Sequence, residues 1–514
     1  MENNGVLPEN TRLRKKGEDE PGDFEVLQAS VDGNNEGQTL KTEDPERPVR
    51  LLKGDHALQL NAICDSLQSA SQYAANPRQQ KFLDQYRQSF LTGDLGVYKD
   101  SQRTWVRDTA PTVENIFGFV EPYRDPYGIR AEFEGLVAIA DRSETALLTK
   151  LVEHSAQFIK QLPWAAGFSD NSGKGPFEKD LFEPPDFTSI HALAYCSSII
   201  FPGINLPNYN DIRQECGFKN VIIANRMSAE SSEADESPFV DSSEAEAFRK
   251  YKYPAYYMWV VLHELLGHGT GKLMTEEEDS WSFDKENPLI NPLTKAPIDS
   301  WYRPGQTWTG VFGDLATTVD ECRAELVGAY LMDDPKLLAL FGYTSSSEIK
   351  AQDITYNLYM QIGVDGLRGL QNFNVEGHKW GQAHSRAHFA MLKCLLRNGN
   401  RSMQIDCNEA ENSLKVRVDR SRIQSEGKAS LGQMLLRLHM YRCTADVESC
   451  REYFEDLSKV DGQYLTWRRI VLSKKQPKWV FVQANTFLEG EEVVLREYEA
   501  TPEGVIQSWA DRDL

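Results

Sequence analysis

The strongest constraint in this sequence is a pair of histidines that directly follows an apolar run. The run spans Tyr253–Leu262, and the motif His-Glu-Leu-Leu-Gly-His occupies residues 263–268. An apolar run of this kind predicts a buried helix, which carries both histidines into the interior. Because His263 and His268 are five residues apart, a regular α-helix would place them about 140° apart around its axis. The spacing therefore predicts a π-bulge at the motif, which Gly267 would ease.

The residue types of this motif are those of a metal site. Two neutral imidazole nitrogens, with a carboxylate beside the metal-bound water, are the groups that a zinc enzyme uses. The alternative is two ordinary core histidines near a helix end. A second motif, Asp-Glu-Cys-Arg-Ala-Glu at 320–325, favours the metal, because Glu321 and Glu325 share one helix face. Spacing alone leaves both open as the third ligand, and a neighbouring carboxylate would then orient a histidine ring.

Charge and hydropathy exclude several classes of protein. The 56 basic and 77 acidic residues give a net charge of −21, which argues against non-specific binding to nucleic acid or to an anionic membrane. The longest apolar run, Tyr253–Leu262, is too short to span a bilayer. The N-terminus shows no secretory signal. Since the eight cysteines form no paired spacing, they indicate reduced thiols in a cytoplasmic protein.

The hydrophobic pattern changes along the chain. Residues 1–50 are rich in charge and poor in apolar residues, so we expect this segment to be mostly disordered, except for strand-like Phe24–Val31. From residue 51 the period is mainly helical. Near the C-terminus, the β-like runs 478–483 and 492–498 flank a turn at Gly490 and predict a hairpin. The pattern favours a large helical unit and a smaller α+β unit built from both ends of the chain.

These motifs resemble the dipeptidyl peptidase III family of zinc peptidases. The family signature is HExxGH, followed some fifty residues later by an ECRAE element, and residues 263–268 and 321–325 match these two elements. Further matching elements occur in the same order at residues 123–128, 132–135, 204–209, 217–220 and 382–384. The resemblance runs from about Leu51 to the C-terminus.

The resemblance implies an α+β fold with two lobes around a wide cleft. The mostly helical, zinc-binding catalytic lobe would take residues 142–188 with 235–478. A smaller mixed lobe with a β-barrel would anchor the substrate and take residues 51–141 with 189–234 and 479–514, leaving 1–50 as an acidic segment. Full-length relatives have a large N-terminal portion ahead of the matched region. We therefore expect a chain truncated at its N-terminus and an incomplete barrel.

The resemblance also implies roles for individual residues. One Zn²⁺ per chain would be bound by His263, His268 and Glu321, while Asp320 and Glu325 would hold the two histidine rings. The catalytic residues would be Glu264, which takes a proton from the water, and Tyr123 and His384, which face the oxyanion. The substrate's free ammonium group would be anchored by Glu121, Glu134, Asn205 and Asn208.

The function implied is a zinc-dependent dipeptidyl peptidase that removes dipeptides from the N-terminus of short, unfolded oligopeptides. We expect a cytoplasmic monomer whose partners are oligopeptides with a free N-terminus, and not nucleic acid or membranes. One alternative is a catalytically weak, truncated form that acts as a zinc-stabilised peptide-binding or regulatory module. Another is a zinc endopeptidase, which would cut N-acetylated peptides equally well.

Overall fold

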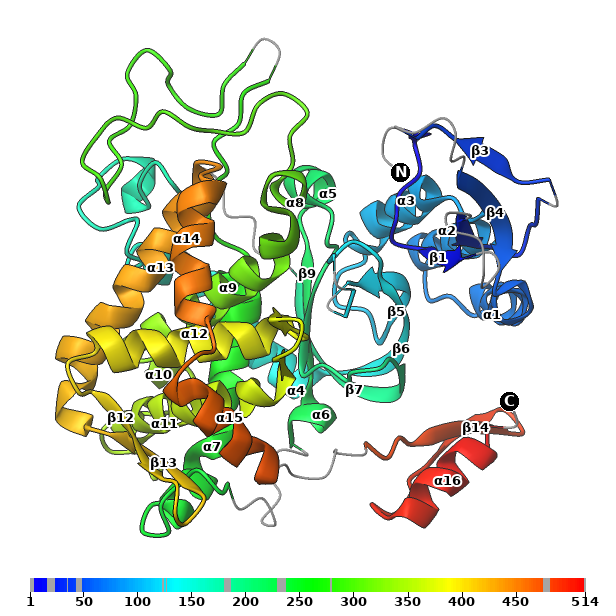
Figure 1. Ribbon diagram of the computed structural model, residues 1–514. Helices are drawn as coiled ribbons and strands as arrows, with labels where there is room; N and C mark the ends of the chain where they lie inside the picture. Colours follow the sequence, from blue (N-terminus) through cyan, green and yellow to red (C-terminus); the bar gives the residue numbers. More distant parts are fainter. Residues whose placement is uncertain are drawn as a thin grey trace.

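The chain has a mixed α+β architecture with two large hydrophobic cores, which belong to two lobes (Figure 1). A computed structural model describes residues 4–15, 24–34, 36–42, 49–122, 124–125, 127–179, 186–228, 237–277, 280–474 and 481–512. The larger core lies mainly within residues 148–177 and 239–471, and the smaller one within residues 29–223. The residue ranges expected for the two lobes stay a prediction.

The helical lobe is built around one central helix, α9 (Ala316–Leu331), which is buried on nearly all sides. A surface helix would bury a single stripe of residues, so α9 is a core helix and not an amphipathic surface helix. Helices α7, α12 and α13 and the π-helical turn η4 pack against it. The main elements of this lobe are α4 (Arg142–Ile159), α7 (Ala245–Leu262), η4 (His263–Gly267), α8 (Trp308–Phe312), α10 (Pro335–Leu340), α11 (Ala351–Gly369), α12 (Ala383–Asn398), β12 (Met403–Asn408), β13 (Ser413–Val418), α13 (Lys428–Cys443), α14 (Val447–Ser458) and α15 (Gln463–Ser473).

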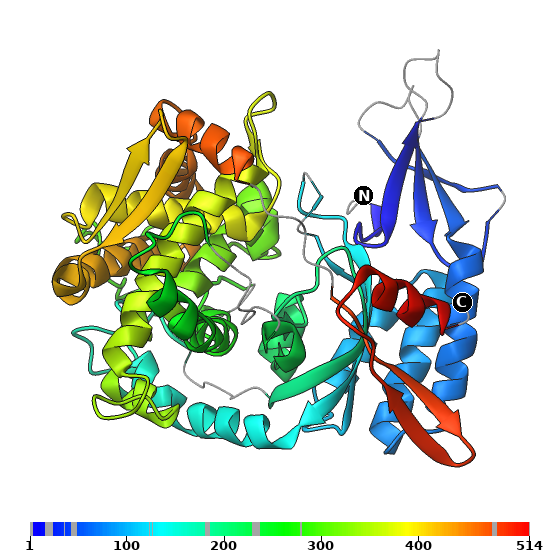
Figure 2. The same cartoon turned by 90° about the horizontal axis from the view of Figure 1, so that it is seen from below.

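The mixed lobe contains a five-stranded sheet in the order β5-β6-β7-β9-β8. Among the described strands, β5 and β8 are the two edges, so the sheet is open. An open sheet agrees with the incomplete barrel that we expected. Helices α1 to α3 bury their apolar faces on this sheet (Figure 2). The elements are α1 (Ala57–Ser71), α2 (Pro77–Thr92), α3 (Leu95–Trp105), β5 (Val113–Glu121), β6 (Glu132–Asp141), β7 (Asp186–Cys196), β8 (Gly203–Leu206), α5 (Asn210–Cys216), β9 (Lys219–Ile223) and α6 (Ala224–Ser228).

The N-terminal segment differs from the expectation of disorder. Its described residues form a sheet in the order β1-β2-β4-β3, with bounds β1 (Thr11–Lys15), β2 (Phe24–Ala29), β3 (Gln38–Leu40) and β4 (Val49–Asp55). Val26, Leu40 and Leu51 share a small core with Val6. The strand predicted within Phe24–Val31 is confirmed by β2, whereas the expectation of disorder was wrong for β1 and β3 because it weighed local composition only. Strand β2, which falls within the strand-like stretch that the sequence predicted, is stabilised by parallel pairing with β4, most of which lies after residue 50.

The C-terminal hairpin is present but begins later than expected. Strands β14 (Asn485–Glu489) and β15 (Glu492–Arg496) pair around Gly490, and helix α16 (Pro502–Ala510) follows them. Of the expected first strand, 478–480 lies outside the described residues and 481–483 is not a strand. Gln483 instead exchanges side-chain hydrogen bonds of 2.7 and 2.9 Å with the backbone N–H and carbonyl of Tyr195. This fastens the C-terminal segment to β7 of the mixed lobe.

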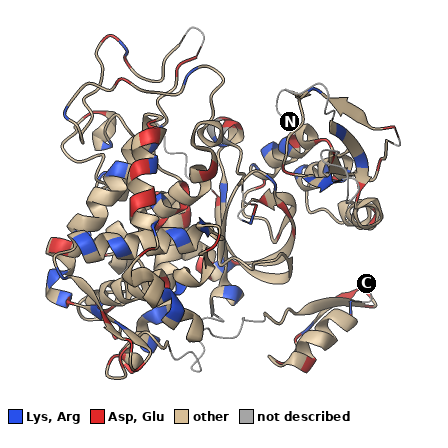
Figure 3. Cartoon of the chain, in the orientation of Figure 1, with Lys and Arg blue, Asp and Glu red and all other residues tan. Residues whose placement is uncertain are grey.

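Charged residues are scattered over both lobes, with acidic and basic positions interspersed along the ribbon (Figure 3). The described part of the chain contains no helix that is long and apolar enough to cross a membrane.

Candidate metal centre and substrate cavity

The His-Glu-Leu-Leu-Gly-His motif forms a π-helical turn at the end of α7. The N–H of His268 donates to the carbonyl oxygen of His263 across 3.0 Å, which is an i to i+5 hydrogen bond. The predicted π-bulge is thereby confirmed. Because the extra residue rotates the turn, the Nε2 atoms of the two imidazoles face each other at 3.0 Å.

Helix α9 presents the third donor of this centre. The Oε2 atom of Glu321 lies 3.2 Å from Nε2 of His263 and 3.5 Å from Nε2 of His268. Among the described residues, these three are the only group of histidine, cysteine and acidic side chains whose ligand atoms lie within 4.8 Å of one another. The geometry therefore favours Glu321 over Glu325, the choice that spacing left open. Two imidazoles and one carboxylate are a donor set that suits zinc and leaves a position for water.

Two further carboxylates contact the opposite sides of the imidazole rings. Nδ1 of His268 lies 3.3 Å from Oδ2 of Asp320, and Nδ1 of His263 lies 3.5 Å from Oε2 of Glu325. Such contacts hold Nδ1 as the protonated nitrogen and leave Nε2 for a metal. Burial acts to raise the pKa of Asp320, but the neighbouring Arg442 guanidinium helps to hold that pKa well below its ordinary value.

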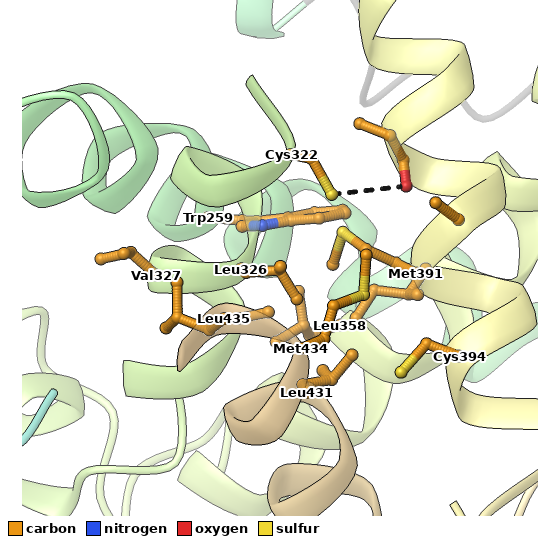
Figure 4. Close-up of a cluster of buried hydrophobic side chains, with 14 of the residues drawn as sticks. Trp259, Cys322, Leu326, Val327, Leu358, Met391, Cys394, Leu431, Met434 and Leu435 are labelled. Atoms are coloured by element: carbon orange, nitrogen blue, oxygen red, sulfur yellow. Dashed lines mark hydrogen bonds between the residues drawn. The ribbon is translucent and has the colours of Figure 1, made fainter. Parts of the chain in front are cut away.

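Cys322, between the two glutamates, has no place in the centre. It is fully buried in a hydrophobic cluster with Trp259, Leu326 and Met391 (Figure 4). Its Sγ lies 4.0 Å from the carbonyl oxygen of Ala387. Burial raises the pKa of this thiol well above its ordinary value, which keeps it neutral.

Glu264 lies beside the three donors, and its side chain is buried. Its Oε2 atom has no hydrogen-bond partner among the described residues. On the other side of the carboxylate, strand β8 packs so closely that a Cβ on Gly203 would lie 2.9 Å from Oε1. Burial raises the pKa of Glu264 above its ordinary value. A buried carboxylate with one unpartnered oxygen and a raised pKa suits a group that accepts and returns a proton.

Helix α12 places two histidines beside the carboxylates of α9. Nδ1 of His384 lies 3.6 Å from Oε2 of Glu321 and 3.4 Å from Oε1 of Glu325. His388, one turn later, lies 3.1 Å from the same Oε1 atom through Nε2. The family resemblance implied a role for His384 and none for His388. The available signal was their spacing of four residues, which places both on one face of a helix.

A cavity of about 670 Å³ connects the metal centre with part of the expected ammonium anchor. Its lining includes the three donors, Glu264, His384 and His388, and also Glu121, Asn205 and Asn208. Glu134 is not among the lining residues. It is 3% exposed, and the hydroxyl of Tyr195 donates to its Oε2 across 3.2 Å. Burial raises the pKa of Glu134 to about 7.

The expected anchor residues differ in what they contact. The side-chain amide of Asn208 donates to Oε2 of Glu121 across 3.0 Å, which holds that carboxylate at the cavity. Asn205 is buried and donates to the backbone carbonyl of Glu264 across 3.1 Å, while its own carbonyl accepts from Arg213. Asn205 therefore joins β8 to the π-helical turn. Tyr123 lies outside the described residues.

Comparison with known proteins identifies one matching family and several similar sequences. The profile of peptidase family M49 matches residues 1–513. The chain is 38% identical over 521 residues to dipeptidyl peptidase 3 of Homo sapiens, covering 98% of this chain and 69% of that protein. It is 38% identical over 468 residues to dipeptidyl peptidase 3 of Nematostella vectensis, covering 90% of this chain and 62% of that protein. The chain thus spans about two thirds of the length of these relatives.

Solved structures share the fold. The dipeptidyl-peptidase III structure from Corallococcus sp. strain EGB superimposes with a TM-score of 0.59 at 17% sequence identity, over 85% of this chain and 70% of that one. The structure of the Caldithrix abyssi protein gives a TM-score of 0.58 at the same 17% identity, over 84% of this chain and 72% of that one.

Proposed function

Because this chain belongs to peptidase family M49, we propose that it is a zinc-dependent dipeptidyl peptidase acting on the N-termini of short oligopeptides. The observation that carries the proposal is the convergence of His263, His268 and Glu321 in one cavity with Glu264. A zinc ion held by these three donors would lower the pKa of its water and polarise the scissile carbonyl.

The chain's own side chains would handle the proton and the developing charge. Glu264 accepts the proton of the attacking water and returns it to the leaving amine, which its raised pKa favours. His384 lines the cavity and would donate to the oxyanion of the tetrahedral species. Tyr123 is a second proposed donor, on the strength of the family resemblance.

The distance between the metal centre and the ammonium anchor would select dipeptides. The Glu121 carboxylate, held by Asn208, would bind the substrate's ammonium group. Two extended residues span at most about 7 Å, so an anchor at a fixed distance from the metal sets the bond that is cut. Glu134 and Asn205 are proposed to support this anchor indirectly, since the first does not line the cavity and the second is bound to the π-helical turn.

The proposal includes a monomeric, cytoplasmic enzyme without nucleic-acid partners. Support comes from the eight cysteines, all of which are unpaired in the structure. Reduced thiols are typical of the cytoplasm. The net charge of −21 disfavours a polyanionic partner.

The test is mass spectrometry of an unblocked octapeptide incubated with the purified, zinc-supplemented protein. We expect stepwise loss of N-terminal dipeptides, with no loss in the Glu264→Gln variant, which keeps the shape of the side chain without its base. The N-acetylated form of the same peptide should remain intact. Equal cleavage of the acetylated peptide would indicate an endopeptidase, and an intact free peptide with zinc bound would refute the proposed activity.

A further inference from the structure

The carboxylate of Glu325 contacts three imidazole rings. Its Oε2 atom lies 3.5 Å from Nδ1 of His263. Its other oxygen, Oε1, lies 3.4 Å from Nδ1 of His384 and 3.1 Å from Nε2 of His388. The carboxylate is buried on α9 and therefore depends on these neighbours rather than on water. Of the three histidines, only His388 lacks a proposed role in the reaction.

The position of His388 is determined by the helices around it. Its ring lies against the indole of Trp259, with ring centroids 5.3 Å apart. The same indole donates from Nε1 to the backbone carbonyl of Glu325 across 3.0 Å. Trp259 is in turn held by α9, since a Cβ on Gly328 would lie 2.7 Å from its Cδ1. One tryptophan thus holds both His388 and the backbone of its carboxylate partner in place.

We propose that His388 is a positioning residue that holds Oε1 of Glu325, so that Oε2 faces Nδ1 of the metal ligand His263. A carboxylate is planar, so fixing one oxygen determines the direction of the other. The 3.1 Å contact has the distance of an ion pair without the alignment of a hydrogen bond in this structure. The inference rests on the proposed metal site.

Loss of this contact frees the Glu325 carboxylate to turn away from His263. Removal of a group that orients a ligand histidine lowers metal affinity by about 10- to 100-fold. The effect of His388 is transmitted through Glu325, so we expect the lower end of that range. The retained groups His263, His268 and Glu321 would still bind the metal, and substrate binding at Glu121 would be unchanged.

Two substitutions separate positioning from packing. Gln places an amide N–H where the Nε2–H of the imidazole was, so His388→Gln keeps the donor to Glu325. Leu fills a similar volume without a donor, so His388→Leu keeps the packing on Trp259 only. A matched control is His191→Leu, because Nε2 of His191 lies 3.2 Å from Oδ2 of Asp141 on a strand that does not line the cavity.

The experiment measures the zinc dissociation constant of the full chain by competition with a chromophoric chelator, a readout independent of activity. We expect His388→Leu to bind zinc about 10-fold more weakly, His388→Gln to stay within about 3-fold of the unsubstituted chain, and His191→Leu to be unchanged. Steady-state kinetics with saturating zinc should show a lower kcat in His388→Leu at an unchanged KM.

Several results would overturn the inference. Zinc affinity of His388→Leu equal to that of the unsubstituted chain would refute positioning, and an equal loss in the Gln and Leu variants would show that the donor to Glu325 is not the cause of the loss. Absence of zinc binding by the unsubstituted chain would instead refute the metal site itself. If His388→Leu does not fold, as judged by circular dichroism, His388→Asn replaces it, because the shorter amide cannot reach Glu325.

Discussion

Gly267 of the π-helical turn lies directly against Ala324 of α9. A Cβ on Gly267 would come within 2.7 Å of both Cα and Cβ of Ala324. Gly267 does not have a positive φ, so the glycine is required by close approach and not by backbone conformation. We expected it to ease the bulge. Its observed role is to let the turn and α9 meet, which brings Glu321 within reach of both histidines.

Gly267→Ala should therefore weaken both folding and metal binding. The added methyl group must push the turn away from α9, and overpacking of this kind costs about 1–3 kcal/mol. Urea unfolding should show a lower midpoint, and zinc should bind more weakly. Gly377→Ala is the control, since its nearest atom would lie at 3.6 Å and its φ is not positive. An unchanged midpoint in Gly267→Ala would contradict the close approach.

Removal of the metal should destabilise the folded chain. A ligand that binds only the native state stabilises it by about 2.7 kcal/mol at a free concentration 100-fold above its Kd. Chelator should therefore lower the thermal midpoint of the unsubstituted protein, and added zinc should restore it. The variant His268→Ala, which lacks one donor, should show little response to zinc. A response equal to that of the unsubstituted chain would argue that zinc binds elsewhere.

Glu134 should make stability depend on pH in the direction opposite to that of an ordinary ion-paired acid. Burial raises its pKa from 4.5 to about 7 in the folded state, so the folded chain holds the proton more tightly than the unfolded chain. Stability from this group is therefore fully present below the unfolded pKa and is lost as the pH rises through the folded one. Since one pKa unit corresponds to about 1.4 kcal/mol, the loss approaches about 3 kcal/mol.

The measurement is urea unfolding of the Glu134→Gln variant at about pH 4 and about pH 8. The amide cannot ionise and can still accept from Tyr195, so the variant should be more stable than the unsubstituted protein at the higher pH and nearly equal at the lower. Glu153→Gln, at an exposed position on α4, should differ at neither. An equal gain at both pH values would show that burial of charge is not the cause.

Glu121→Gln should impair substrate binding more than it impairs the chemistry. The substitution keeps the oxygen that accepts from Asn208 and removes the negative charge. Since a hydrogen bond to a charged group contributes about 1.5–3 kcal/mol, KM for free-amine peptides should rise by roughly 10- to 100-fold. Glu132→Gln is the matched control, because Glu132 pairs with Glu121 across β5 and β6 but does not line the cavity. Equal effects of both substitutions would place the anchor elsewhere.

Much of the site could be predicted from local spacing. The i and i+5 histidines required a π-bulge, and residues 263–267 form one. Spacing could not decide whether Glu321 or Glu325 is the metal ligand, because both lie on one face of the same helix. The packing of α9 against η4 brings Glu321 to Nε2 of both histidines. His388 gave no chemical signal by itself. Its contact with Glu325 exists only because α9 and α12 are packed side by side.

The amino-acid sequence by itself determined the features that depend on neighbours along the chain: the buried helix, the π-bulge, the candidate donors and the hairpin turn at Gly490. The tertiary structure alone decided which carboxylate faces Nε2 of both histidines, that Asn205 joins β8 to the π-helical turn, and that residues 4–15 and 36–42 fold. The physical reason is the separation along the chain of the residues that make contact. Periodicity and spacing report contacts within a few residues, whereas parallel pairing of β2 with β4 and packing of α9 on η4 join segments that no local pattern connects.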